Sequence, residues 1–248
     1  MTSNYIDQIN IEPADLNKVP SEPIPASTVL LLRDGNNTVE VFMIKRAAAS
    51  NFGNAWVFPG GKVDTEDMIS KFSNQPVLFE KGIGDIEISY LLAAIRECFE
   101  ECGVLIANRN SGKIFIPQDE KENKMLKKYQ LQINNNEISF YNILNNLNLY
   151  PAINNLKYLS HWTTPTTEKK RYSTKFYLTA FPNKQHAVHD GFEGVESLWI
   201  SAKDALSLYK SGRFPIILPT IKSLEVISMS KSTNELLSKV INSNSSQD

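Results

Sequence analysis

Residues 96–104, which read Arg-Glu-Cys-Phe-Glu-Glu-Cys-Gly-Val, place three carboxylates on one face of a predicted helix. The helix is indicated by apolar residues that recur at helical spacing up to Gly103, a residue type typical of a helix C-terminal cap. Glu97 stands three and four residues before Glu100 and Glu101, so the three side chains project together. Like charges at this spacing repel by roughly a few tenths of a kcal/mol per pair in water. A divalent cation bound between them would reverse that repulsion.

Clustered glutamates also have a simpler interpretation, because such a pair is commonly just the solvated face of a helix. The neighbouring residues favour metal binding instead. Carboxylate oxygens suit Mg²⁺ or Mn²⁺, and both ions also bridge phosphate oxygens. Arg96, four residues before Glu100, is placed to hold that carboxylate in position.

The same run resembles the second half of the Nudix box, G-x5-E-x7-R-E-U-x-E-E-x-G-U, where U is an apolar residue. Every position of that half is matched by residues 96–104. From average residue frequencies, such a match arises by chance in on the order of one chain in 10⁵. The first half is present in altered form: residues 58–61, Phe-Pro-Gly-Gly, look like the strand-to-loop entry of the family, and Asp67 stands where the pattern has glutamate.

The two halves of the box are further apart than the pattern allows. Between Asp67 and Arg96 lie 28 residues, whereas the pattern has seven, so about 21 are extra. We interpret residues 68–89 as an insertion in the box, and residues 68–85 within it as an inserted loop, because they mix polar residues with proline and glycine. This spacing leaves the role of Asp67 open.

An insertion at this point resembles the Nudix branch of coenzyme A and acyl-coenzyme A diphosphatases found in peroxisomes, and its bacterial relatives. Residues 162–165, 171–177 and 192–199 are similar to stretches of that branch. Residues 46–53 match its coenzyme A signature only in part, because the second arginine of the signature is missing. The peroxisomal members end in a Ser-Lys-Leu-like address and this chain ends Ser-Gln-Asp, so we do not expect import into a peroxisome.

The resemblance implies a set of site residues. The implied metal ligands are Glu97, Glu100, Glu101 and the carbonyl of Gly61, holding Mg²⁺ or Mn²⁺. The implied catalytic residues are those three glutamates together with Arg96 and Glu193. The general base stays open among Glu97, Glu101 and Glu193, an acid six residues before Trp199 where related proteins often carry one. The candidate substrate contacts are Arg46, Gly60, Gly61 and Lys62, although Arg46 equally fits a surface residue that ends a strand, and a lysine such as Lys62 is more often solvated.

The activity implied is metal-dependent hydrolysis of a diphosphate linkage in a small-molecule substrate, with coenzyme A or an acyl-coenzyme A as the leading candidate. The alternative substrates are other nucleoside diphosphate derivatives, such as ADP-ribose or a dinucleotide. A different class of function is a non-catalytic Nudix module that senses a nucleotide metabolite. The intact charged cluster on the helix speaks against a sensor, because a site without chemistry has no physical need of it.

The resemblance also implies an α/β fold, a Nudix-type α/β/α sandwich around a mixed sheet with a box insertion and an added helical region. Strands are predicted at residues 27–32, 39–45, 172–181 and 197–200, and helices at 202–210 and 218–230. We read residues 1–248 as a single domain. Its outer parts are an irregular entry segment at 1–25, a mainly helical insertion at 117–160 and a polar tail at 240–248.

The composition excludes several partner classes. A net charge of −1 supplies no general basic field for nucleic acid, and no apolar stretch approaches the length of a membrane span. Cys98 and Cys102, the only cysteines, are four residues apart in the predicted helix and are interpreted as reduced packing residues. The first residues lack the pattern of a signal peptide, so we expect a cytoplasmic protein.

Overall fold

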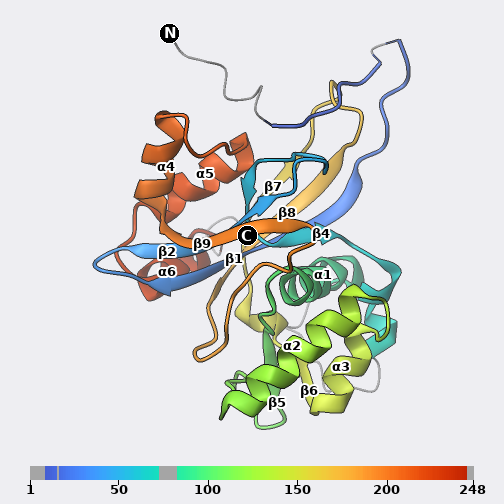
Figure 1. The fold of residues 1–248 in the computed structure, drawn as a ribbon, viewed down its shortest axis with the longest axis vertical. Coiled ribbons are helices and arrows are strands. Elements are labelled where there is room, and N and C mark those ends of the chain that lie inside the picture. The colour runs from blue at the N-terminus through green and yellow to red at the C-terminus, as the bar shows by residue number, and fades with distance from the viewer. Residues whose placement is uncertain (1–8, 16, 73–82, 245–248) are drawn as a thin grey trace.

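The computed structural model describes residues 9–15, 17–72 and 83–244 (Figure 1). Its centre is a seven-stranded mixed sheet in which the strand order is β3-β2-β1-β8-β7, while β4 also pairs with β1 and β9 also pairs with β2. The bounds are β1 Ile24–Asp34, β2 Val39–Arg46, β3 Trp56–Val57, β4 Gly60–Lys62, β7 Lys157–Thr163, β8 Tyr172–Ala180 and β9 Gly194–Ser201.

Strand β1 organises the sheet, because it pairs with three other strands. It forms an antiparallel hairpin with β2, in which Leu32 lies opposite Val41. Its other edge pairs in parallel with β8 along nine residues, from Ile24 opposite Tyr172 to Leu32 opposite Ala180. This partner on the second edge extends β1 beyond the predicted residues 27–32, since each added residue completes backbone hydrogen bonds on that side.

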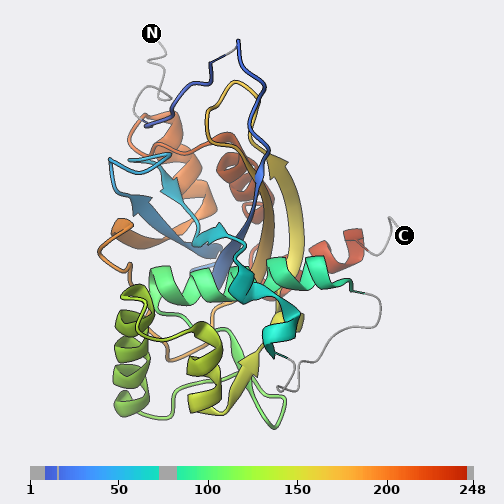
Figure 2. The ribbon, with the colours of Figure 1, turned by 90° about the vertical axis from the view of Figure 1, so that its right-hand side faces the viewer.

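Alternation along β1 creates two hydrophobic cores. Val29 and Leu31 face one core, which they share with helix α1 (Asp85–Cys102). Leu30 and Leu32 face the other core, which is closed by α4 (Ala202–Lys210), α5 (Leu218–Ile227) and α6 (Thr233–Asn244). Because successive side chains of a strand point to opposite faces, a strand buried on both faces reads as a continuous apolar run. Figures 1 and 2 show the sheet between these helical layers, which confirms the expected α/β/α sandwich around a mixed sheet.

Helices α2 (Glu120–Asn134) and α3 (Phe140–Leu147) form a further layer beneath α1, together with the two short strands β5 (Ala107–Arg109) and β6 (Leu149–Pro151) (Figure 1). The predicted helical insertion at 117–160 therefore contains two helices, but its last part is not helical. It holds β6, a short 3-10 turn at Ile153–Asn155 and the start of β7. A short apolar run does not distinguish a buried strand from a helix, which accounts for the difference.

The C-terminal region also differs from the prediction. The polar tail expected at 240–248 is helical as far as Asn244, because α6 occupies Thr233–Asn244. Leu236 and Val240, four residues apart on α6, are buried in the second core, so this mostly polar segment still has a narrow apolar face. The preceding helix α5 ends at Ile227 rather than at residue 230.

The two remaining predicted segments are described in part. Residues 9–15 and 17–23 form isolated bridges and turns without a regular element before β1 begins at Ile24. In the box insertion, a 3-10 turn at Ile69–Phe72 is followed by residues 73–82, which lie outside the described residues, and α1 begins at Asp85. Within the described ranges, no helix has both the length and the apolar character of a membrane span.

Candidate active site

Helix α1 carries the predicted acidic cluster and ends as the sequence indicates. Gly103 adopts a left-handed conformation with a φ of 72°, and its N–H donates to the carbonyl of Phe99. Ile95, Phe99 and Cys102 on this helix are fully buried in the core that it shares with the sheet. This packing fixes the rotation of the helix about its axis, and the acidic residues of its last two turns are thereby directed toward β4 and α2.

Arg96 is the centre of the cluster. The residue is 7% exposed, and its guanidinium donates two hydrogen bonds of 2.9 Å to the carboxylate of Asp67. Further bonds run from Arg96 to Glu97 Oε1 at 2.9 Å, to Glu100 Oε2 at 3.0 Å and to the carbonyl of Lys62 at 2.9 Å. Burial acts to lower the pKa of Arg96, but the bonds to Asp67 and the surrounding carboxylate charges outweigh it and raise that pKa.

Asp67 contributes to the cluster as the partner of Arg96 and not as a residue of the cavity wall. It is 1% exposed, and besides Arg96 its carboxylate accepts a 2.7 Å bond from the N–H of Asp64. These two residues form a capping box around the 3-10 turn Thr65–Asp67. The chain thus brings Asp67 and Arg96 together although 28 residues separate them, and the insertion does not disrupt the two halves of the motif.

Strand β4 meets the same helix through its two glycines. Glu101 is 8% exposed and accepts a 2.9 Å hydrogen bond from the N–H of Gly60. A Cβ atom on Gly61 would lie 2.4 Å from the carboxyl carbon of Glu97, so a larger residue here would displace that carboxylate from its position against the strand. The predicted site residues of the strand and of the helix are therefore in contact.

Arg46 and Glu193 lie at the other end of the cluster. Arg46, at the end of β2, is 3.9 Å from Glu101 and 3.6 Å from Glu193 between charged atoms. Glu193 is held by a turn in which the carboxylate of Asp190 accepts hydrogen bonds from the N–H groups of residues 192, 193 and 194. Its side chain is 65% exposed, so Glu193 is the most accessible of the predicted catalytic acids.

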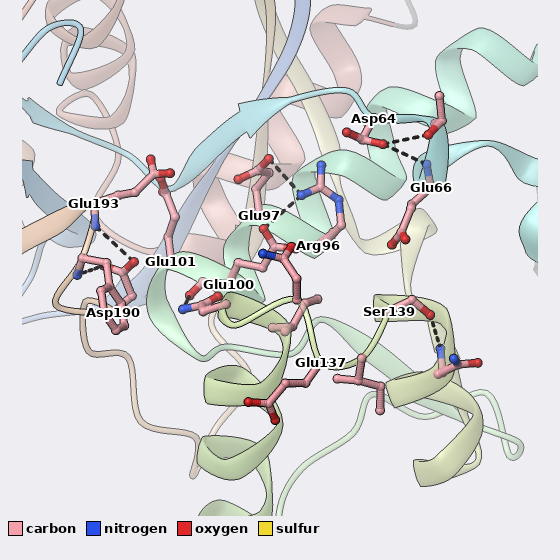
Figure 3. Close-up of a pocket in the computed structure, with 17 residues that line it drawn as sticks. Asp64, Glu66, Arg96, Glu97, Glu100, Glu101, Glu137, Ser139, Asp190 and Glu193 are labelled. Carbon is pink, nitrogen blue, oxygen red and sulfur yellow. Dashed lines mark hydrogen bonds and ion pairs between the residues drawn. The ribbon is translucent and has the colours of Figure 1, made fainter.

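A cavity of about 620 Å³ opens over these residues, and acidic side chains dominate its lining (Figure 3). Eight carboxylates line it, whereas Arg96 is its single basic residue among those described. The carboxylates belong to Asp64, Glu66, Glu97, Glu100, Glu101, Glu137, Asp190 and Glu193. A cavity of this charge repels a free phosphate ester and attracts cations.

The carboxylates on α1 are held in an environment that resists their ionisation. Burial raises the pKa of Glu97 to about 7, although the charge of Arg96 opposes the shift. Burial likewise raises the pKa of Glu100, and burial together with the charge of Glu97 raises the pKa of Glu101 well above its ordinary value. Buried negative charges in excess of their partners store unfavourable energy that a bound cation would release.

This donor set fits a hard divalent cation, although the described part of the chain holds no preformed ion site. Within the described residues, no three acidic, histidine or cysteine side chains already converge on one point, since Glu97 and Glu100 direct oxygens to Arg96. Arg96 also makes three hydrogen bonds to Asp67 and Lys62 that do not involve these glutamates. Both glutamates can therefore exchange Arg96 for an ion while the arginine stays anchored, and oxygen donors suit Mg²⁺ and Mn²⁺.

The raised pKa of Glu97 gives a pH dependence for the metal-free protein. The pKa of Glu97 is about 7 in the folded protein against an ordinary value of 4.5, so the folded state binds the proton more tightly than the unfolded state. The resulting stabilisation is fully present below about pH 4.5 and is lost as the pH rises through 7. We expect the contribution of Glu97 to the free energy of unfolding to fall by about 2 kcal/mol between about pH 5.5 and pH 8. Urea denaturation in chelator-treated buffer measures it.

The matched control for this pH dependence is Glu97→Gln, which removes the Glu97 titration and should make the fall between the two pH values about 2 kcal/mol smaller, so that any remaining fall comes from Glu100 and Glu101. Saturating Mg²⁺ should stabilise the wild-type protein more at pH 8 than at pH 5.5, because protons compete with the ion for the same carboxylates. A metal-free profile that is already flat in the wild-type protein would contradict the burial of this charge.

Several residues of the site have no signature in the sequence. Asp64, Glu66 and Asp190 line the acidic cavity from loops, and Glu137 lines it from the connection between α2 and α3. Two side-chain amides of α2 also contact the ligand-bearing helix: the buried Gln130 and the half-buried Asn134 donate hydrogen bonds of 3.0 and 3.1 Å to the carbonyl of Glu100. That carbonyl lies in the last turn of α1, where helical partners run out, so the insertion completes the end of the helix.

The three histidines lie apart from this cluster. His161 is bonded to Ser173 and His189 to Ser197, while His186 is exposed and 3.7 Å from Glu120. The cysteines match their interpretation as packing residues, since Cys98 and Cys102 are both free and fully buried.

Comparison with known proteins identifies relatives of this chain. A model of the NUDT19 Nudix domain matches residues 72–227. The acyl-coenzyme A diphosphatase NUDT19 of Xenopus laevis is 25% identical and aligns with 84% of this chain and 65% of its own length. The putative nudix hydrolase 7 of Caenorhabditis elegans is 27% identical over 87% of this chain and 64% of its own. This chain therefore spans slightly less than two thirds of either relative.

The crystal structure of a NUDIX hydrolase from Alicyclobacillus acidocaldarius has a similar fold. It superposes with a TM-score of 0.69 and 26% sequence identity, and the match covers 88% of this chain and 96% of the bacterial one. The layers described above are thus those of a Nudix hydrolase, with the box helix α1 packed on the mixed sheet.

Proposed function

Because the chain belongs to the NUDT19 Nudix domain family, we propose that it is a divalent-cation-dependent hydrolase that cleaves the diphosphate linkage of coenzyme A or an acyl-coenzyme A. The observation that carries the proposal is the cavity over α1, which eight carboxylates line against one arginine. An anionic diphosphate enters such a cavity only together with cations. Glu97, Glu100, Glu101 and the carbonyl of Gly61 are the proposed ligands.

Mg²⁺ or Mn²⁺ bound at these oxygens would neutralise the charge of the diphosphate and would lower the pKa of a nearby water. The protein residues position the reaction. Arg96, fixed by Asp67, holds Glu97 and Glu100 on the side of α1 that lines the cavity. The N–H of Gly60 orients Glu101 from the opposite side. These contacts keep the carboxylates together on the wall of the cavity before an ion or a substrate binds.

The reaction adds water across one phosphorus–oxygen–phosphorus bridge, so that coenzyme A yields adenosine 3′,5′-bisphosphate and phosphopantetheine. Three acids are placed to accept the proton of the attacking water. Glu97 lies against Gly61 of β4 and lines both the acidic cavity and the second cavity beside it. Glu101 is more deeply buried, and Glu193 is the most exposed of the three.

Support for the coenzyme A part of the proposal comes from the relatives, because the Xenopus laevis protein is named an acyl-coenzyme A diphosphatase. The position of the insertion inside the box and the partial match at residues 46–53 agree with that branch.

Chromatographic product analysis tests the proposal. The purified protein is incubated with coenzyme A, acetyl-coenzyme A, ADP-ribose or NADH, each with Mg²⁺, with Mn²⁺ and with chelator. The expected result is adenosine 3′,5′-bisphosphate from the coenzyme A substrates only when a metal is present. AMP from ADP-ribose or NADH alone would assign the chain to another nucleoside diphosphate derivative, and tight binding without any product would make it a sensor.

A further inference from the structure

A second cavity of about 360 Å³ lies beside the acidic one, and its volume falls within the range of small-molecule pockets. The two cavities share four lining residues, Asp64, Arg96, Glu97 and Glu193. Glycines of β4 also line the second cavity, so it adjoins the place where the diphosphate would react. A substrate cleaved at this boundary extends one of its two halves into the second cavity.

The two cavities differ sharply in charge. Among the described residues, those that line only the acidic cavity include five carboxylates and no lysine or arginine. The residues that line only the second cavity include Arg46 and Lys62 and no carboxylate. Metal ions bound on the acidic side would neutralise the charge of the diphosphate. The basic residues of the second cavity are then available to pair with a further anionic group of the substrate.

Of the two cations, Lys62 is the one without a partner. Arg46 is engaged with Glu101 and Glu193, whereas Lys62 forms no ion pair within the described part of the chain. The alternation of β4 explains its direction: Gly61 faces Glu97 on α1, so the side chain of the next residue points to the opposite face, where the second cavity lies.

The rest of the wall favours a planar ring. Phe52, Phe58, Tyr172 and Phe176 line this cavity, together with the amide side chain of Asn51. Phe52 has a φ of 57°, an unusual conformation for a bulky residue, and its N–H donates a 2.8 Å bond to the carbonyl of Asn10. Aromatic side chains contact flat bases well, and an amide can pair with the polar edge of a base.

We propose that the second cavity binds the phosphoadenosine half of the substrate, and that Lys62 pairs with a phosphate on the ribose that is separate from the cleaved diphosphate. The inference rests on the proposed function and deepens it, because it states which half of the substrate lies on which side of β4. Coenzyme A carries such a ribose 3′-phosphate, whereas ADP-ribose does not. Lys62 is then the residue that distinguishes these two classes of substrate.

Calorimetric titration of the metal-free protein tests this assignment without any turnover. The ligands are adenosine 3′,5′-bisphosphate and AMP, which differ only in the ribose 3′-phosphate. We expect the wild-type protein to bind the bisphosphate about tenfold or more tightly than AMP, as one charge-assisted hydrogen bond would give. Lys62→Met should abolish that difference and leave the affinity for AMP unchanged, and Lys62→Arg should retain the preference.

The matched control is Lys45→Met. It removes a lysine of β2 that pairs with Glu196 of β9 and does not line the cavity. It should keep the wild-type preference. If Lys62→Met weakens the affinity for both ligands equally, Lys62 contacts the 5′-phosphate and the assignment is overturned. A preference for the bisphosphate that is unchanged in Lys62→Met would also overturn it. Failure of the proposed function would give a different result. Coenzyme A would then not be hydrolysed in the presence of metal, whereas the preference for the bisphosphate and its dependence on Lys62 would still be measured.

Discussion

Replacing Glu100 by glutamine is expected to reduce the turnover of coenzyme A by at least about 100-fold, the loss typical of removing a group that stabilises the reacting charge. Glutamine has the same shape but no negative charge, so it binds a divalent cation weakly. The fold should be retained, because burial already raises the pKa of Glu100 and the amide removes an unfavourable buried charge. Steady-state product formation gives kcat, and a thermal melt checks folding.

The control for this variant is Glu137→Gln, which removes the same charge from the same cavity but from the connection between α2 and α3. We expect it to change kcat by less than about fivefold, since a charge that is not a ligand acts only through the general field. A Glu100→Gln protein with full turnover would refute the assignment of Glu100 as a metal ligand. Equal losses in both variants would show that the cavity acts through its total charge.

The acidic cluster on α1 could be predicted from sequence because its geometry is local. Glu97, Glu100 and Glu101 lie within five residues of one helix, and the helical repeat alone places them on one side. Gly103 as the cap follows from the same local rule. The β1–β2 hairpin can also be predicted from the local sequence, because turn residues separate two apolar runs.

The rest of the site depends on contacts between distant segments, and no periodic pattern records those. Asp190 and Glu137 reach the cavity from loops whose paths are set by the packing of β9, α2 and α3. The bonds from Gln130 and Asn134 to Glu100 likewise require α2 to pack beside the end of α1. The helix at the C-terminal end escaped prediction for a related reason: α6 depends on burial of a narrow apolar face rather than on its polar composition.

Asp67 is the residue whose role the sequence left open, and its replacement by alanine is the second variant with a large expected effect. The structure makes it the partner that neutralises Arg96 in a buried position. We expect Asp67→Ala to lower the free energy of unfolding by about 2–3 kcal/mol, because Arg96 loses two buried charge-assisted hydrogen bonds while it keeps those to Glu97 and Glu100. Urea denaturation in metal-free buffer measures the loss.

Two further variants separate the ion pair from other effects of the substitution. Glu66→Ala removes an exposed acid from the same 3-10 turn and should change stability by less than about 0.5 kcal/mol. The double variant Asp67→Ala with Arg96→Met removes both partners, and it should be less destabilised than the sum of the single variants, because the interaction between Asp67 and Arg96 is then lost only once. Additive losses would mean that Asp67 acts mainly as the cap of Asp64. A coupled result would show that Asp67 stabilises the site through Arg96, and so that the inserted segment leaves intact the contact between the two halves of the box.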